Sequence, residues 1–124
     1  MVTHSKIPVD VVASPEFLGQ HEDKFAFAYT VRITNRSEQN ITLRNRHWII
    51  THADGSVEEV IGEGVIGKTP ELGPGKSYSY TSGAVIPTSV GSMRGSYGFV
   101  TGDGQSFRAK IPEFTLHTPD ALLH

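Results

Sequence analysis

FAFAYTVRIT, residues 25–34, is the stretch that decides the fold. Its odd positions carry large apolar side chains and its even positions carry small or polar ones, which is the period-two alternation of a β-strand. A helix would scatter the large side chains around its circumference. The stretch therefore predicts a long strand whose core-facing residues are Phe25, Phe27, Tyr29, Val31 and Ile33.

Alternation of the same kind recurs on both sides of this stretch. An earlier apolar run over residues 7–13 predicts a strand that ends at Ser14-Pro15. Pro112 interrupts the last run, and because Phe114 and Leu116 resume on the opposite parity, we expect a bulge or a change of strand there. Further strands are predicted over residues 43–51, 57–60, 76–82, 93–99 and 107–116.

Glycine, proline, asparagine and aspartate gather between these runs. Asp54-Gly55 predicts a hairpin with a type I′ turn, in which both central residues have positive φ. Pro74-Gly75 suits the centre of a type II turn. Gly102-Asp103-Gly104 predicts a second hairpin, and residues 35–40 are typical of a longer turn. No window shows a sustained helical period.

About seven strands, separated by turns roughly every 8–12 residues, predict an all-β fold. We expect a fibronectin type III or immunoglobulin-like β-sandwich of two antiparallel sheets, with a small barrel as the alternative. The length of 124 residues suits one domain. We expect a single domain over residues 1–124, with an ordered core over about residues 7–117 and a loose C-terminal tail from Thr118.

Composition excludes several classes of function. The net charge of −2 gives no electrostatic reason to expect nucleic acid or an anionic membrane as a partner. The chain has no cysteine, so it holds neither a disulfide nor a thiolate metal site. No apolar stretch approaches the ~20 residues that span a bilayer, and the N-terminus lacks the apolar core of a secretory signal. We therefore expect a cytoplasmic protein.

Gly62-Glu63-Gly64-Val65-Ile66-Gly67 matches the GxGxxG pattern of dinucleotide-binding loops. That pattern needs a helix directly after it, whereas two prolines and two glycines occupy residues 68–75 here. We interpret the segment as an irregular crossover between sheets, with Val65 and Ile66 tucked into the core. The alternative that stays open is an anion loop that binds a nucleotide or pyrophosphate through Gly62, Gly64, Gly67 and Lys68.

Groups that carry catalysis or bind metals do not gather in the sequence. The closest histidines, His47 and His52, are five residues apart, so a regular strand sends them to opposite faces. The pairs Glu22-Asp23 and Glu58-Glu59 are typical of solvated charges. We therefore expect no enzyme activity, no cofactor and no resident metal. A divalent-metal sensor, built across strands from histidines and carboxylates, stays open as an alternative.

Arg44-Asn45-Arg46-His47-Trp48 is the second segment that suggests binding. If Trp48 faces inward, the two arginines share its parity. Either their stems then pack along the sheet while their heads reach its edge, or the strand starts later. We expect a solvated strand end with His47 half-buried. The hypothesis kept beside it is a patch that binds a partner or an anion, formed by Arg44, Arg46, His47 and Trp48.

A series of motifs, in this order, closely resembles the ApaG family, also called CorD. The motifs are FAYTV (27–31), RHWIIT (46–51), DG (54–55), VIGEGVIG (60–67), YSYTSG (78–83), GSMRGSY (91–97) and IPEF (111–114). The resemblance implies a fibronectin type III-like sandwich in a bacterial cytoplasmic protein. It also implies a family linked to cobalt resistance and magnesium efflux, whose gene neighbours include a diadenosine tetraphosphate hydrolase. The family's glycine loop has been read as a pyrophosphate site, and His47 stands where many members carry Tyr.

Domains similar to ApaG also occur in eukaryotic F-box and polymerase-interacting proteins, where they resemble protein-interaction modules. Together with the sandwich pattern, this resemblance implies a non-enzymatic binding module that acts through a sheet face or edge. We expect a protein partner of unidentified nature, and a chain that is a monomer or a homodimer. A direct role in ion conduction is excluded, because no segment spans a membrane.

Overall fold

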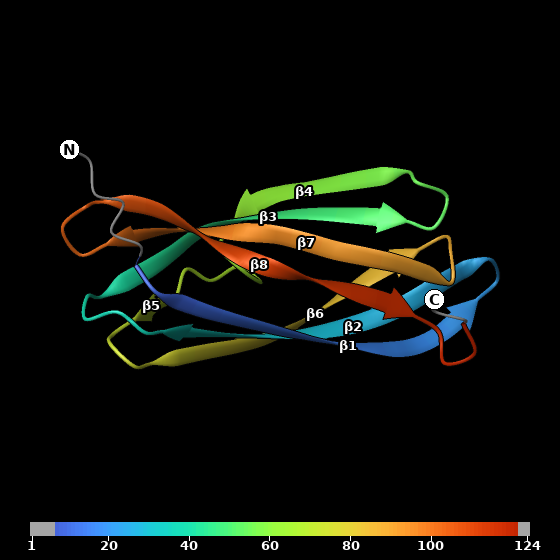
Figure 1. Ribbon diagram of the computed structural model, residues 1–124, viewed down its shortest axis with the longest axis horizontal. Coiled ribbons are helices and arrows are strands. Elements are labelled where there is room, and N and C mark those ends of the chain that lie inside the picture. The colour runs from blue at the N-terminus through green and yellow to red at the C-terminus, as the bar shows by residue number, and fades with distance from the viewer. Residues whose placement is uncertain (1–6, 122–124) are drawn as a thin grey trace.

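The computed structural model describes residues 7–121, and they form two antiparallel β-sheets packed face to face (Figure 1). The strands are β1 (Val9–His21), β2 (Lys24–Asn35), β3 (Ile41–His52), β4 (Val57–Glu63), β5 (Glu71–Leu72), β6 (Ser77–Ile86), β7 (Val90–Thr101) and β8 (Ser106–His117). One sheet has the order β1-β2-β6, and the other has the order β4-β3-β7-β8 with β5 paired to β3. No helix within the described residues is long and apolar enough to cross a membrane.

β2 contains the stretch that predicted the fold. Its apolar positions from Phe27 to Ile33 are buried, whereas Thr30 and Arg32 between them are exposed. The predicted alternation is therefore confirmed, and so is the prediction of an all-β sandwich of two antiparallel sheets. The structure has eight strands rather than about seven, because the two-residue β5 forms a separate pairing with β3.

The core lies between the sheets and takes side chains from the inner faces of both. Trp48 is 2% exposed and Ile50 is 8% exposed, so both point inward from β3. Tyr97 and Phe99 on β7 and Ile111 on β8 meet them there. Full burial of one such side chain contributes about 1.5–3 kcal/mol, so this layer of side chains dominates the stability of the sandwich.

β1 is longer than the sequence predicted. The strand does not end at Ser14-Pro15 but continues to His21, with Pro15 paired to Tyr29. Proline has no backbone N–H, so it cannot donate a hydrogen bond to a neighbouring strand. An inner strand has neighbours on both sides, whereas β1 pairs only with β2 and is therefore an edge strand, where proline is tolerated. The expected strand end at Ser14-Pro15 is wrong for this reason.

Glycines with positive φ occupy the two turns discussed next. Gly75 has φ +76°, and the Lys76 amide donates to the Gly73 carbonyl at 3.0 Å, which confirms the type II turn. The Asp54-Gly55 hairpin is confirmed, but its turn is not type I′. Only Gly55, with φ +88°, is left-handed, which is typical of a three-residue loop that ends in a bulge.

The C-terminal strand confirms one expectation and corrects another. Met93 faces Phe114 while Gly95 faces Ile111, so β8 has one residue more than β7 at Pro112, where the sequence predicted a bulge. Thr118 was expected to begin a loose tail. Instead it is 6% exposed, and its amide donates to the Ser89 carbonyl at 3.1 Å.

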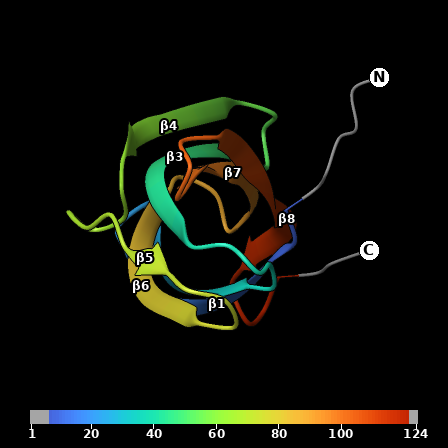
Figure 2. The same cartoon turned by 90° about the vertical axis from the view of Figure 1, so that its left-hand side faces the viewer.

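The two long sides of the sandwich differ. On one side, the edge strands β1 and β8 contact each other and close the core. On the other side lie β4 and β6, each of which pairs with a single neighbour. Figure 2 looks along the sandwich and shows β8 on the side opposite to the gap between β4 and β6. The free edges of both sheets therefore border the same side of the molecule.

Candidate functional site at the free edge of the sandwich

β4 is the most exposed strand of the molecule. Six of its seven residues are exposed, and Gly62 alone is half-buried. Three of the exposed side chains are large and apolar: Val57 at 58%, Val60 at 38% and Ile61 at 74%. Unpaired backbone amides and carbonyls together with apolar side chains make such an edge a template for another strand.

Three carboxylates, those of Glu58, Glu59 and Glu63, lie among these apolar residues along β4. Glu59 accepts from Nε2 of His47 at 2.5 Å, and Glu58 contacts Nε2 of His52 at 2.7 Å. Both carboxylates are more than half exposed, so each pair contributes at most about 1 kcal/mol. Glu59 and the third carboxylate, Glu63, lie on the outer face of the sheet, because their strand partners Ile49 and Asn45 alternate with inward-facing residues.

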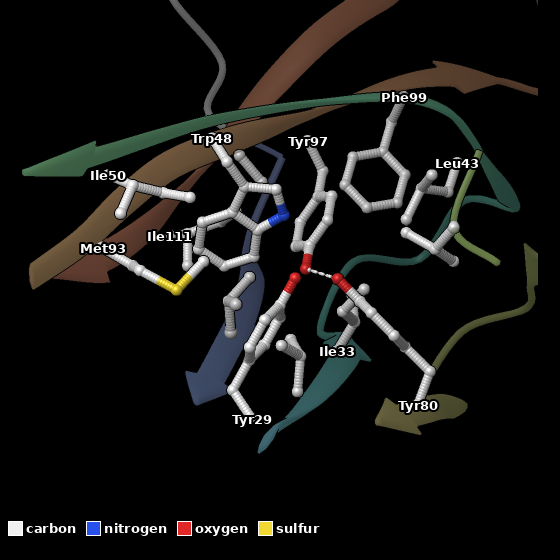
Figure 3. Close-up of a cluster of buried hydrophobic side chains, with 14 of the residues drawn as sticks. Tyr29, Ile33, Leu43, Trp48, Ile50, Tyr80, Met93, Tyr97, Phe99 and Ile111 are labelled. Carbon is white, nitrogen blue, oxygen red and sulfur yellow. Dashed lines mark hydrogen bonds between the residues drawn. The ribbon is translucent and has the colours of Figure 1, made fainter. Parts of the chain in front are cut away.

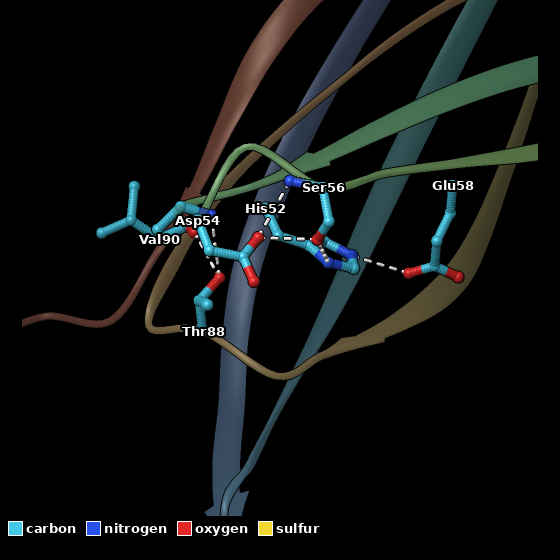
Figure 4. A network of polar contacts seen from close by, with 7 residues as sticks. His52, Asp54, Ser56, Glu58, Thr88 and Val90 are labelled. Carbon is cyan, nitrogen blue, oxygen red and sulfur yellow. Dashed lines mark hydrogen bonds and ion pairs between the residues drawn. The ribbon is translucent and has the colours of Figure 1, made fainter.

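A hydrogen-bonded chain fixes the hairpin end of this edge (Figure 4). The Ser56 hydroxyl donates to Oδ1 of Asp54 at 2.6 Å, so its oxygen accepts from Nδ1 of His52 at 3.0 Å. Nε2 of His52, on the other side of the ring, contacts Glu58, so the ring is held between the turn and β4. The bonds from Ser56 also lower the pKa of the Asp54 carboxyl.

A groove of about 270 Å³ lies under the inner face of β4. Glu58 and Val60 on β4 form one wall, and residues 82–85 on β6 form the other. Trp48 and Met93 form part of its floor, next to Tyr29 and Ile50 (Figure 3). Since both walls belong to edge strands, the groove occupies the side of the sandwich that none of the eight described strands closes.

Arg46 stands at one end of this groove. It faces inward because Arg44 is the extra residue of a bulge between Leu43 and Asn45, which shifts the parity of β3. Its Nη1 donates to the Glu63 carbonyl at 2.9 Å and to the Gly64 carbonyl at 3.0 Å. Nε and Nη2 have no partner among the described residues, so they remain available as donors.

Trp48 and three tyrosines form a polar cluster inside the core next to the groove (Figure 3). The Tyr80 and Tyr97 hydroxyls bond to each other, and the Tyr29 ring packs edge-on against Trp48 at 5.3 Å between ring centres. Burial raises the pKa of Tyr80 to about 12 and raises that of Tyr97 further. The indole N–H of Trp48 is buried without a partner among the described residues.

The glycine segment does not connect the two sheets, contrary to the sequence interpretation. It links β4 to β5, which pair with the same strand β3, and the chain changes sheets only afterwards, at the turn over residues 73–76. Val65 is buried as expected. Ile66, however, is 58% exposed with φ +48°, because it and Gly67 form the tip of a tight turn closed by mutual bonds between Val65 and Lys68.

The proposed anion loop has few free amides. Those of Gly64, Val65 and Lys68 donate to backbone carbonyls at 2.8–3.0 Å, and Gly62 lies within β4 against the Arg46 guanidinium. An anion nest needs several amides that point at one spot. The residues predicted to bind pyrophosphate therefore do not present several free amides toward one spot in this structure.

The predicted basic and aromatic patch is divided between three surroundings. Arg44 is exposed in the bulge, Arg46 faces the groove, and His47 lies on the outer face with its side chain 32% exposed. Trp48 is in the core, so it takes no part in an exposed patch. The expectation of a half-buried His47 is confirmed, and so is its placement on the face opposite to His52.

Sequence reasoning missed β4 as a site. A signal was present, because Val60 and Ile61 are adjacent and break the alternation that a half-buried strand shows. The sequence predicted solvated charges at Glu58-Glu59 and did not indicate that each carboxylate contacts a histidine. Each of these two carboxylates pairs with one histidine. The described residues nevertheless contain no group of three or more potential metal ligands.

Comparison with known sequences identifies relatives of the whole domain. The profile of the ApaG domain matches residues 15–101. Protein ApaG of Pseudomonas paraeruginosa is 50% identical over 116 residues, which cover 94% of this chain and 92% of that protein. Protein ApaG of Methylobacterium nodulans is 47% identical over 115 residues, which cover 90% of this chain and 88% of that protein.

Solved structures agree with these sequences. An X-ray structure of a structural genomics target matches with a TM-score of 0.90 at 43% identity, over 92% of this chain and 89% of that chain. A crystal structure of a Bordetella pertussis protein matches with a TM-score of 0.87 at 41% identity, over 92% of this chain and 96% of that chain. The names of these relatives state no activity or ligand.

Proposed function

The chain belongs to the ApaG domain family, and we propose that it is a non-enzymatic binding module that takes a protein partner at the free edge of β4. The observation that carries the proposal is the exposure of this edge. Among residues 7–121, Ile61 is the most exposed of the large apolar side chains, at 74%, and it stands on a strand whose second edge has no neighbour in that range.

Strand addition is the mode of binding that such an edge supports. The backbone of an extended partner segment bonds to the unpaired amides and carbonyls, and its alternate side chains contact the residues on either face. Val57 and Ile61 offer apolar contacts on the outer face, while Val60 offers one above the groove. The seven residues of β4 exceed the usual strand length of about 5–6 residues, so a complete partner strand fits along it.

The link to ion handling that the family resemblance implies is then an indirect one. We place this chain in the cytoplasm, where the bound protein, rather than the chain itself, connects to cobalt resistance and magnesium efflux. Under this proposal, a variant that disrupts β4 binding loses the ion phenotype while its fold stays intact.

Capture from a native lysate, with matched variants as bait, tests the proposal. Ile61→Lys places a charge on the exposed edge, whereas Val12→Lys places the same charge on β1 in the other sheet, where Val12 is 60% exposed. We expect the wild-type chain and Val12→Lys to retain the same stoichiometric partner, and Ile61→Lys to retain at least tenfold less. Both surface variants keep the wild-type unfolding free energy within about 0.5 kcal/mol.

Two results would contradict the proposal. One is the absence of any stoichiometric partner over a range of salt concentrations. The other is equal capture by both lysine variants, which would place the contact away from β4.

A further inference from the structure

The groove beneath β4 specifies the side chains of the partner segment. Resting on the proposed function, we infer that the partner is an extended strand that presents an acidic, an apolar and a basic side chain, at alternate positions, to the groove. The inference comes from three inward-facing positions of β4 and from what stands across from each of them on β3.

Pairing between β3 and β4 sets the spacing of these positions. Gly62 pairs with Arg46, Val60 pairs with Trp48 and Glu58 pairs with Ile50. They are two residues apart, so at ~3.4 Å per residue each neighbouring pair is separated by about 7 Å. A strand that adds to β4 has the same rise, so its own alternate side chains match these three positions.

The middle position takes an apolar side chain. Trp48, Ile50, Val60 and Met93 line the groove there, together with Ala84 from β6. Its volume of about 270 Å³ is below the ~300–1,000 Å³ of sites for drug-sized ligands, whereas it leaves room for one large side chain. This size is the reason for assigning the groove to a side chain of the partner strand rather than to a free small molecule.

The position next to Gly62 takes an acidic side chain. Arg46 is held in place by its two bonds to backbone carbonyls, and its Nε and Nη2 are the donors left over. The absence of a side chain at Gly62 keeps the guanidinium accessible, since a Cβ there would lie 2.8 Å from it. A planar guanidinium with two free donors is well suited to a carboxylate.

The position next to Glu58 takes a basic side chain. One carboxylate oxygen of Glu58 contacts His52, and the other has no partner among the described residues. The side chain is 51% exposed at the mouth of the groove, where a lysine or arginine can reach it from solvent. A second acidic residue would be repelled there.

A second copy of this chain does not fit the same edge. Glu58, Glu59 and Glu63 give β4 three carboxylates and no basic residue, so two copies of β4 would place like charges side by side. The partner strand therefore comes from a different protein. For antiparallel pairing, the residue opposite Gly62 comes first, and the partner reads acidic-x-apolar-x-basic from its N-terminus.

Synthetic peptides test this order of side chains. A peptide centred on Glu-Thr-Leu-Thr-Lys is titrated into the ¹⁵N-labelled chain and compared with the reversed order, Lys-Thr-Leu-Thr-Glu, which has the same composition. We expect the first peptide to shift the amide signals of residues 57–63 and the indole signal of Trp48, and to bind at least tenfold more tightly than the second. In Glu58→Lys, the preference moves to a peptide with Glu at both ends.

The outcomes separate the two proposals. If both peptides shift the signals of residues 57–63 with equal affinity, the order of side chains is wrong while strand addition at β4 stands. If the preference in Glu58→Lys is unchanged, Glu58 does not select the basic residue and the inference also fails. If shifts arise only away from β4, or none arise at millimolar peptide, the inference fails, and capture with Ile61→Lys and Val12→Lys decides the proposed function independently.

Discussion

Ile66 has a backbone conformation that its side chain disfavours. Its φ is +48°, and a β-branched residue in the left-handed region costs about 1–2 kcal/mol relative to its usual conformations. Asparagine tolerates this region because its short polar side chain bonds locally. The conformation of Ile66 therefore lowers the stability of the chain, and a substitution at this position can restore it.

We expect Ile66→Asn to raise the free energy of unfolding by about 1 kcal/mol. Ile66→Val is the control, because it keeps a β-branched side chain and should stay within about 0.5 kcal/mol of wild type. Urea unfolding measures both. A loss of stability in Ile66→Asn would mean that the apolar contacts of the isoleucine outweigh the strain.

The buried tyrosines predict a loss of stability at high pH. An unfolded tyrosine releases its proton near pH ~10, whereas burial raises the pKa of Tyr80 to about 12 and that of Tyr97 still further. Between these values the unfolded state loses protons first. The contribution of these two tyrosines to the free energy of unfolding is therefore constant below pH ~10, and above that pH it falls by about 1.4 kcal/mol per pH unit for each of them.

Urea unfolding at a series of alkaline pH values measures this slope. In the double variant Tyr80→Phe with Tyr97→Phe, the slope should disappear over the same range. A wild-type stability that stays constant from pH ~10 to ~12 would show that the two phenols ionise as readily in the folded chain as in the unfolded one.

At the scale of elements, β7 depends on a close approach to β3. A Cβ at Gly95 would lie 1.9 Å from the His47 carbonyl oxygen, and the backbone of a central strand cannot move away. We expect Gly95→Ala to destabilise the protein by more than about 3 kcal/mol. Gly102→Ala, with open space around the added carbon, is the control and should change stability by less than about 0.5 kcal/mol.

Thermal unfolding of the two variants checks this prediction. A Gly95→Ala protein that unfolds at the wild-type temperature would show that β3 and β7 are less tightly paired at this point than their register indicates.

Elements could be predicted from sequence wherever one local pattern decides them. The alternation of residues 25–34 was sufficient for β2, and Pro112 was sufficient for the bulge in β8. The end of β1 was not predictable, because Pro15 breaks a strand or is tolerated depending on whether the strand is an edge. That property belongs to the sheet rather than to the local sequence.

The site was harder to predict than the fold for a similar reason. Arg46 faces inward only because of the bulge at Arg44, and the groove needs residues from β3, β4 and β6 together. Val60-Ile61 was visible as an adjacent apolar pair, but only the strand order shows that no other strand within the described part of the chain covers this pair. The chemistry of a site between two sheets depends on long-range pairing that a sequence pattern does not specify.

At the scale of the whole molecule, the charge of β4 predicts a monomer. Its three glutamates repel a second copy, which is one of the ways in which edge strands avoid self-association. We expect a single species of monomer mass in sedimentation at neutral pH. Replacing Glu58, Glu59 and Glu63 with glutamine removes the repulsion and should produce a concentration-dependent dimer. A wild-type dimer would contradict this account of the edge.

The central claim is that β4 is the surface where a partner binds, and crosslinking inside cells tests it most directly. A photoreactive phenylalanine analogue is placed at Ile61, or at Val12 as the control, since both side chains are at least 60% exposed but lie on different sheets. The account predicts a discrete adduct with one protein from position 61 and none from position 12. Adducts from position 12 alone, or equally from both positions, would contradict it.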